Sequence, residues 1–209
     1  MTFITVEGIE GVGKSTAVKF IHDYLIKAKQ SVVLTREPGG TLIAEKIRQV
    51  LLTPTPEEKM EPDTELLLVF AARAQHIRNV ILPELKAKKW VISDRFIDAT
   101  FAYQGGGRQM DISRIETLER WIVNGLHPDM TLLLDAPAHV GLERAKHRGP
   151  RDRIEQEKIA FFERVREGYL KRAARDKKRF CIIDAAQSLE KVHLELKNIL
   201  DKLLLRENK

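Results

Sequence analysis

The sequence contains a single cysteine, Cys181, and no hydrophobic run long enough to cross a bilayer. One cysteine excludes a disulfide within the chain and a metal site built from cysteines, and its apolar neighbours indicate a core position. The longest apolar run, Leu66 to Ala72, is far shorter than the roughly 20 residues of a membrane-spanning helix. An apolar stretch follows Met1 almost at once, with no basic leader. We therefore expect a cytoplasmic protein without a membrane partner.

Charge and apolar content are both substantial. The 209 residues include 36 Lys and Arg against 30 Asp and Glu, which gives a net charge of +6, and 43% of the residues are hydrophobic. This apolar fraction supports a buried core, and the length suits one domain over residues 1–209. The positive balance favours anionic partners, which are either phosphorylated small molecules or nucleic acid.

Five short runs rich in Val, Ile or Leu predict β-strands: Phe3–Val6, Ser31–Thr35, Trp90–Ser93, Thr131–Leu134 and Phe180–Ile183. Because these runs lack polar alternation, both faces of each strand should be buried, as in a parallel sheet covered by helices. Helical periodicity predicts seven helices: Ser15–Lys29, Thr41–Leu52, Asp63–Lys89, Asp111–Asn124, Ala138–His147, Ile154–Arg175 and Ser188–Leu205. The expected fold is α/β, a doubly wound, five-stranded parallel sheet flanked by helices, with binding residues at the carboxyl ends of the strands.

A glycine-rich loop joins the first predicted strand to the first helix. Gly8 to Ser15 fit the pattern of a glycine, any four residues, then Gly-Lys-Ser or Gly-Lys-Thr, which is typical of a phosphate-binding loop. Its backbone N–H groups and the helix N-terminus attract phosphates, Lys14 would reach the terminal phosphates, and the Ser15 hydroxyl would bind Mg²⁺. A merely glycine-rich turn is the alternative, but the flanking strand and helix favour a nucleoside triphosphate with Mg²⁺. The residues expected to hold it are Gly8, Ile9, Glu10, Gly11, Val12, Gly13, Lys14, Ser15 and Thr16.

Charged residues follow four of the predicted strands, at Glu7, Arg36–Glu37, Asp94–Arg95 and Asp135. The carboxyl ends of parallel strands meet at one edge of a sheet, so these residues predict a site there. Asp94 stands where an acid can hold Mg²⁺ through water, and Arg95 offers a planar pair of donors to a second phosphate. An ordinary exposed arginine is the alternative for Arg95.

Two further segments suit a sugar or a base. Tyr103–Arg108 contains three successive glycines and predicts a flexible loop with polar groups, although a plain connector fits the same residues. Phe70 and Arg73 are three residues apart on a predicted helix and so share a face. An aromatic ring beside an arginine can stack on a base and bond its carbonyl, whereas Phe70 fits the core equally well.

The segment from Glu143 to Glu155 is dense in cations and is interrupted by Gly149-Pro150. A basic helix, a hinge and a second helix predict a mobile lid over phosphates, at about residues 138–154. Such a lid would supply cations to the charge shared between the donor and the acceptor in phosphoryl transfer. A solvated helix face is the alternative.

Together these motifs resemble the thymidylate kinase family nearly end to end. The segments that carry the resemblance are GIEGVGKST (Gly8–Thr16), TREPGGT (Thr35–Thr41), IRQVLL (Ile47–Leu52), FAARAQH (Phe70–His76), SDRF (Ser93–Phe96), AYQGGGR (Ala102–Arg108), LLLDAP (Leu132–Pro137) and DRIE (Asp152–Glu155). The family implies a P-loop kinase fold with a short helical lid. It also implies transfer of the γ-phosphate of ATP to dTMP, with Mg²⁺, in a cytosolic homodimer.

The resemblance also implies roles for residues of the acceptor pocket. Glu10 should face the sugar of the monophosphate, Glu37 and Pro38 should line the pocket, and Arg48 and Arg95 should bind its phosphate. Arg73 should bond the thymine carbonyl, Thr100 and Gln104 should approach the base, and Tyr103 should crowd the ribose 2′ position. The family usually has a stacking aromatic residue where this chain has Val69, and the aromatic Phe70 stands one position later. Either Phe70 turns to stack on the base, or weaker apolar contacts hold the base.

The catalytic residues implied are Lys14, Arg95 and a lid arginine. The phosphate-binding loop contains no arginine, whereas the lid contains Arg144, Arg148, Arg151 and Arg153, which resembles the bacterial type of the family. We favour Arg153 for the catalytic role, with Arg148 and Arg151 next.

Other function classes fit the sequence less well. Another deoxynucleotide or nucleoside monophosphate kinase would use the same loop and lid, whereas Arg48 and Arg95 argue against a nucleoside acceptor. A regulatory GTPase needs a guanine-reading Asn-Lys-x-Asp stretch, which the sequence lacks. A nucleic-acid-binding protein would spread its charge along a phosphate backbone, but here the densest cations fall in one segment, so we expect no nucleic-acid partner.

Overall fold

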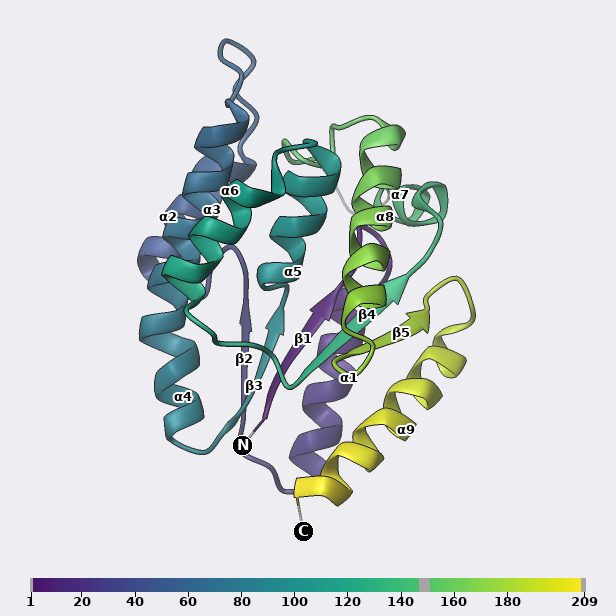
Figure 1. The fold of residues 1–209 in the computed structure, drawn as a ribbon. Coiled ribbons are helices and arrows are strands. Elements are labelled where there is room, and N and C mark those ends of the chain that lie inside the picture. The colour runs from purple at the N-terminus through teal and green to yellow at the C-terminus, as the bar shows by residue number, and fades with distance from the viewer. Residues whose placement is uncertain (1, 147–150, 208–209) are drawn as a thin grey trace.

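The computed structural model describes residues 2–146 and 151–207. Five parallel strands form one sheet in the order β2-β3-β1-β4-β5 (Figure 1). The strands are β1 (Phe3–Glu7), β2 (Val32–Arg36), β3 (Trp90–Asp94), β4 (Met130–Asp135) and β5 (Phe180–Asp184). Every end lies within one residue of its predicted position, so the prediction of a five-stranded parallel sheet is confirmed.

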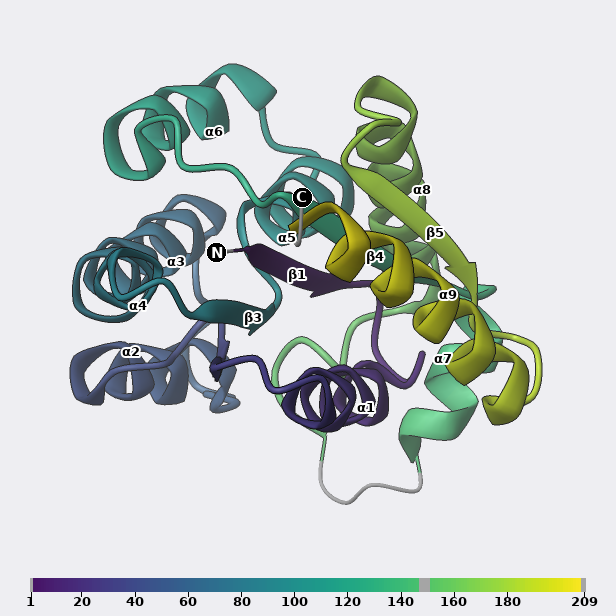
Figure 2. The same ribbon diagram turned by 90° about the horizontal axis from the view of Figure 1, so that it is seen from below.

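Helices cover both faces of the sheet. Figure 2 shows α1 and α9 on one face and α5 and α8 on the other. The α-helices are α1 (Lys14–Lys27), α2 (Leu42–Leu52), α3 (Pro62–His76), α4 (Leu82–Lys86), α5 (Ile97–Thr100), α6 (Ile112–Leu118), α7 (Ala138–Ala145), α8 (Ile159–Arg175) and α9 (Leu189–Glu207). Three π-helical segments continue some of them: η1 (Ile77–Ile81), η2 (Phe101–Gly107) and η3 (Glu119–Val123). No described helix combines the length and the apolar content of a membrane span.

Burial differs between the inner and the outer strands. The residues of β1 are all buried, whereas Leu34 of β2 and Ile182 of β5 are 43% and 53% exposed. The prediction that every strand is buried on both faces is therefore wrong for the two edge strands, because an edge strand has a neighbour on only one side. Cys181 in β5 is half-buried and packs against the larger of two hydrophobic clusters.

Two predicted helix boundaries need correction. The stretch predicted as one helix, Asp63–Lys89, comprises α3, η1 and α4, and it begins at Pro62 after the N-cap residue Glu61. The helix predicted from Ile154 begins at Ile159 instead. Its first residues form turns because the Asp152 carboxylate accepts the backbone N–H groups of Ile154 and Glu155. Asp111 is the N-cap residue of α6, and its side chain accepts the N–H of Ser113.

The glycine-rich segment predicted as a flexible loop is helical. It forms most of η2, which packs closely against α8. A Cβ atom added to Gly106 would lie 2.7 Å from the Arg164 carbonyl oxygen in α8. The glycines thus permit close packing of two helices rather than loop motion.

Candidate active site

The phosphate-binding loop lies between β1 and α1, as predicted. Gly11 has a positive φ of 75°, and an added Cβ atom there would lie 1.7 Å from the carbonyl oxygen of Gly141 in α7. The loop therefore packs directly on the backbone of α7. Lys14 donates a hydrogen bond from Nζ to the Ile9 carbonyl at 2.7 Å. Burial and the nearby Arg95 lower the pKa of Lys14 to about 8, so this site favours an anion that compensates the ammonium charge.

Two candidate Mg²⁺ ligands flank this loop. Asp94 ends β3, and its Oδ1 atom is buried without a hydrogen-bond partner among the described residues. Ser15 is exposed in the first turn of α1. A buried carboxylate oxygen without a donor is costly unless a cation or water pairs with it, so Asp94 fits a cation. Among the described residues, no cluster of three His, Cys, Asp or Glu side chains forms a separate metal site.

Arg95 joins the phosphate-binding loop to the neighbouring pocket. Its backbone has a φ of 73°, which is rare for a residue with a side chain. Its guanidinium donates to the Gly8 carbonyl at 2.9 Å, to the Tyr169 hydroxyl at 3.0 Å and to Glu10 at 3.0 Å. The group also lies over the Tyr103 ring, at 4.8 Å from its centroid. The alternative of an ordinary exposed arginine is wrong, because the side chain is only 16% exposed.

The buried carboxylate of Glu7 connects β1 to the Tyr169 hydroxyl that Arg95 contacts. Glu7 at the end of β1 accepts the Phe96 backbone N–H at 2.7 Å and the Tyr169 hydroxyl at 2.8 Å. Burial, followed by repulsion from Asp98, raises the pKa of Glu7 to about 8. Tyr169 therefore links β1 to the Arg95 side chain from the distant helix α8.

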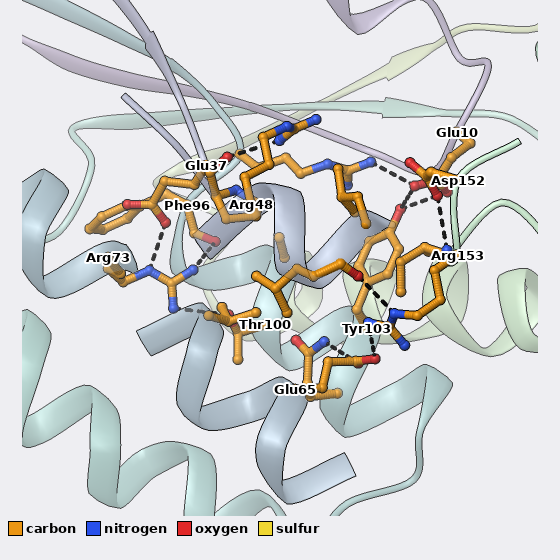
Figure 3. Close-up of a pocket in the computed structure, with 18 residues that line it drawn as sticks. Glu10, Glu37, Arg48, Glu65, Arg73, Phe96, Thr100, Tyr103, Asp152 and Arg153 are labelled. Atoms are coloured by element: carbon orange, nitrogen blue, oxygen red, sulfur yellow. Dashed lines mark hydrogen bonds and ion pairs between the residues drawn. The ribbon is translucent and has the colours of Figure 1, made fainter. Parts of the chain in front are cut away.

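A pocket that Arg95 helps to line opens at the carboxyl ends of β1, β2 and β3 (Figure 3). It is lined by Glu10, Glu37, Pro38, Arg48, Leu51, Leu52, Glu65, Val69, Arg73, Arg95, Phe96, Ala99, Thr100, Tyr103, Gln104, Asp152, Arg153 and Ile154. All but one of the residues predicted to bind an acceptor lie in this set. The exception is Phe70.

Arg73 is held rigidly in the wall of the pocket although it is only 2% exposed. Its Nε atom donates to Glu37 at 2.7 Å, Nη1 donates to the Thr100 hydroxyl at 2.9 Å, and Nη2 donates to the Phe96 carbonyl at 3.1 Å. The other Glu37 oxygen pairs with His76 at 2.9 Å. A guanidinium has five N–H groups, so two remain for a ligand in the pocket.

The structure corrects the expectation for Phe70. This side chain is 2% exposed and belongs to a hydrophobic cluster with Phe3 and Phe96, while Val69 lines the pocket in its place. Its ring lies 5.0 Å from the Arg73 guanidinium carbon, so it stacks on the arginine and not on a ligand. Successive helical residues point about 100° apart, which explains why a shift of one position removes the ring from the pocket.

Another lining residue from α3 is the buried carboxylate Glu65. It accepts Gln104 Nε2 at 2.7 Å, and it pairs with Arg108 at 3.0 Å and Arg153 at 2.7 Å. The Tyr103 hydroxyl, from the same π-helix as Gln104, donates to Glu10 at 2.7 Å. Glu65 thus holds together three segments that are distant in sequence.

The predicted lid arginines occupy different places. Arg153 lines the pocket, where Nε also donates to the Leu51 carbonyl at 2.7 Å. Arg151 is exposed and lines a separate surface hollow beside α7, and Arg144 donates to the Ala185 carbonyl at 2.8 Å. Arg148 and the Gly149-Pro150 break lie outside the described residues. Of the lid arginines that the structure describes, only Arg153 lines the main pocket.

A second hollow lies on the other side of the phosphate-binding loop. It is lined by Val12, Gly13, Thr16, Ala17, Arg144, Ala185, Gln187, Leu189, Val192 and His193. Sequence reasoning missed this hollow because its walls come from α1, α7 and the start of α9, which no motif joins. It also missed Glu65, although a carboxylate just before the apolar run Leu66 to Ala72 is a detectable signal. Tyr169 carries no such signal.

The site combines a phosphate-binding loop, an acid at the end of β3 with one oxygen that has no hydrogen-bond partner among the described residues, and a polar pocket at the same sheet edge. These features define a P-loop phosphotransferase for a small acceptor. The family model for thymidylate kinase matches residues 6–196. The chain therefore belongs to the thymidylate kinase family.

Several individual proteins are similar over almost the whole chain. The thymidylate kinase of Chromohalobacter salexigens is 55% identical over 195 residues, covering 93% of this chain and 92% of that protein. The thymidylate kinase of Ruthia magnifica is 51% identical over 201 residues, covering 96% and 98%. The crystal structure of thymidylate kinase from Ehrlichia chaffeensis superimposes with a TM-score of 0.77 at 35% identity, covering 95% of this chain and 98% of that one.

Proposed function

We propose that this protein transfers the γ-phosphate of ATP to dTMP and releases ADP and dTDP. The observation that carries the proposal is the position of Arg95, whose guanidinium contacts the phosphate-binding loop at Gly8 while lining the adjacent pocket. A phosphate on an acceptor in that pocket would lie next to the donor phosphates. Membership of the thymidylate kinase family supports dTMP as this acceptor.

On the donor side, residues 8–16 hold the ATP phosphates, and Lys14 supplies the charge nearest to the transferred group. The unpartnered Asp94 oxygen and the exposed Ser15 hydroxyl fit Mg²⁺. When bound, Mg²⁺ neutralises charge on the donor phosphates. The hollow beside Arg144 and Gln187 receives the adenine and its ribose, since it adjoins the loop at Gly13.

On the acceptor side, Arg73 donates to the thymine carbonyl with its remaining N–H groups. Thr100 and Gln104 contact the base, and Glu37 with Pro38 lines the pocket. The Tyr103 and Glu10 side chains, joined by a hydrogen bond, close the space around the sugar, which favours a deoxyribose. Arg48 and Arg95 bind the acceptor phosphate.

Transfer needs positioning and positive charge more than a base, because the attacking phosphate oxygen is already ionised. Lys14, Arg95 and a lid arginine stabilise the charge shared by the donor, the transferred group and the acceptor. We assign the lid to residues 138–154 of a single domain covering 1–209, with Arg153 as the first catalytic candidate and Arg148 and Arg151 next. Arg153 would act from the acceptor side, where its contacts lie.

The test is ADP release with ATP and Mg²⁺, offering dTMP, dUMP, dCMP, UMP, AMP and thymidine in parallel. Strong turnover with dTMP is the expected result. Turnover confined to another monophosphate would keep the donor site but overturn the proposed acceptor. Silence with every acceptor would overturn the whole proposal.

We also propose a homodimer formed through α2, α3 and η3. Large apolar side chains are exposed along these elements, which pack against one another: Leu42, Ile43, Val50, Leu67 and Trp121. Such a surface loses contact with water when a second copy covers it. Sedimentation equilibrium should give a dimer, and Leu67→Glu should give a monomer, whereas Leu194→Glu on α9 should remain dimeric. A monomeric unaltered chain contradicts the proposal.

The proposed reaction uses ATP and a deoxynucleotide, which are cytoplasmic metabolites, so we place the protein in the cytoplasm. Fractionation of cells that express it, followed by detection with an antibody, tests this placement. Recovery in the membrane fraction contradicts it.

A further inference from the structure

A hydrogen bond with Glu65 fixes the orientation of the Gln104 side-chain amide. Its Nε2 atom donates to Glu65 Oε1 at 2.7 Å, and both residues are buried in the wall of the main pocket. No hydrogen bond among the described residues involves the side-chain oxygen of Gln104, and this oxygen is not among the buried polar atoms that lack a partner. The amide therefore offers its carbonyl to the pocket.

The charge of Glu65 is what fixes this orientation. An ionised carboxylate only accepts hydrogen bonds, so the amide can face it only with its NH₂ group. Arg108 and Arg153 both pair with the same carboxylate, and its hydrogen bonds with Arg108 lower the pKa of Glu65 despite its burial. Glu65 thus stays ionised and leaves the amide no second orientation.

The resulting pocket presents a donor and an acceptor to the base. Arg73 and the Gln104 carbonyl line the same pocket, the first with free N–H groups and the second with free lone pairs. Thymine has a carbonyl at position 4 and an N–H at position 3, which match this pair. Cytosine has an amino group at position 4 and a bare nitrogen at position 3, so both contacts would be mismatched.

We infer that Glu65 is a specificity-determining positioning residue, which selects thymine over cytosine by fixing the Gln104 amide with its carbonyl toward the base. The inference rests on the proposed dTMP kinase function. The choice between the two bases is thus assigned to Glu65, which orients the Gln104 amide that contacts the base. A glutamine in place of Glu65 both donates and accepts, so the Gln104 amide could turn and offer its NH₂ group to cytosine.

The test compares kcat/KM for dTMP with kcat/KM for dCMP in Glu65→Gln and the unaltered enzyme. We expect the dTMP preference to fall at least about tenfold, because a site built for a hydrogen bond discriminates strongly only while its donor and acceptor are fixed. Asp63→Asn is the matched control, since it removes an exposed ion pair with Arg114 from the same helix and should keep the preference. A purely structural role would lower both kcat/KM values together and leave their ratio unchanged.

Glu65→Gln removes the charged partner of Arg108 and Arg153, which destabilises the fold. A second pair of variants keeps the inference testable if this variant does not fold. The double variant with Glu65→Gln and Arg108→Gln removes one cation along with the carboxylate, and it should also lose the preference. Arg108→Gln alone retains Glu65 and its ion pair with Arg153, so it should keep the preference. Gln104→Leu should lose the preference too, and adding Glu65→Gln to it should cause no further loss.

A preference within twofold of the unaltered enzyme in both Glu65→Gln and the double variant overturns the inference. The unaltered enzyme is assayed first, so failure of the proposed function is recognised separately, as an absence of dTMP turnover.

Discussion

The acceptor pocket and the donor side differ in how far their side chains are already fixed. In the pocket, Arg73 makes three hydrogen bonds within the protein, and Glu65 pairs with two arginines. On the donor side, Ser15 and Thr16 are exposed and the Asp94 oxygen has no partner among the described residues. Under the proposed function, the pocket is preorganised to select a base, whereas the donor site would be completed by the nucleotide and its cation.

The largest expected effect tests the donor side. Lys14→Ala should lower kcat about a thousandfold, because a charge on the transferred phosphate acts mainly in the transition state. The KM for dTMP should change little. Steady-state kinetics with each substrate varied in turn measures both quantities.

Lys19→Ala is the matched control for that change, since Lys19 lies on the same helix with a side chain that is 77% exposed. A rise in the KM for dTMP as large as the fall in kcat would contradict the separation of the two regions.

Removal of Arg73, the arginine proposed to bond the base, tests the pocket. Arg73→Ala should lower kcat/KM for dTMP about a hundredfold while the KM for ATP stays unchanged. It should also lower the free energy of unfolding by about 3 kcal/mol, because Glu37 loses its main partner while remaining buried. Kinetics and denaturant titration measure the two losses.

Arg78→Ala, an exposed arginine on η1, should leave both quantities unchanged. An Arg73→Ala enzyme that keeps its affinity for dTMP would show that the base is read elsewhere.

Glu7 lies where the two regions meet, and it predicts a pH dependence. Its pKa is raised from the ordinary 4.5 to about 8, so the folded state keeps a proton that the unfolded state has lost. Stability from this group is therefore fully present below pH 4.5 and is lost as pH rises to about 8. We expect the free energy of unfolding to fall by about 1 kcal/mol per pH unit between pH 5.5 and 7.5.

Urea titrations at both pH values measure this slope, and Glu7→Gln should flatten it. An unchanged slope in Glu7→Gln would show that other groups produce the dependence.

The smallest expected effect concerns the connection between the regions. Tyr169→Phe removes the hydroxyl that joins Glu7 to Arg95. Because one hydrogen bond contributes about 1 kcal/mol, the KM for dTMP should rise about fivefold. The kcat should change little. Tyr24→Phe is the control, because its hydroxyl bonds Asp201 far from the site. Equal KM values for these two variants would show that Arg95 is positioned without Tyr169.

The sequence predicted best what depends on local pattern. The strands and the phosphate-binding loop are read from short runs of residues, and both were located correctly. The position of Asp94 and Arg95 at the site was predicted from the rule that the carboxyl ends of parallel strands lie at one edge of a sheet. Local pattern also placed the pocket residue Arg73, because the FAARAQH motif carries it.

The failures have physical reasons of two kinds. Phe70 was misplaced because a single position decides which way a helical side chain points, and the core competed with the ligand for this ring. The three glycines in η2 predict flexibility from their sequence, although α6 fills the space beside Gly105 and α8 fills the space beside Gly106 and Gly107. Glu65 and Tyr169 act through partners distant in sequence. The apolar run that follows Glu65 is a local signal for that carboxylate, but no local pattern reveals Tyr169.

The contact between Gly11 and Gly141 has a consequence for variation and redesign. A Cβ atom at Gly11 would lie 1.7 Å from the Gly141 carbonyl oxygen, and one at Gly141 would lie 2.4 Å from the Glu10 carbonyl oxygen. Because each glycine faces backbone atoms, no substitution at the other position makes room for a larger residue. A larger residue at either place would push α7 away from the phosphate-binding loop, so an enzyme library should keep glycine at both positions.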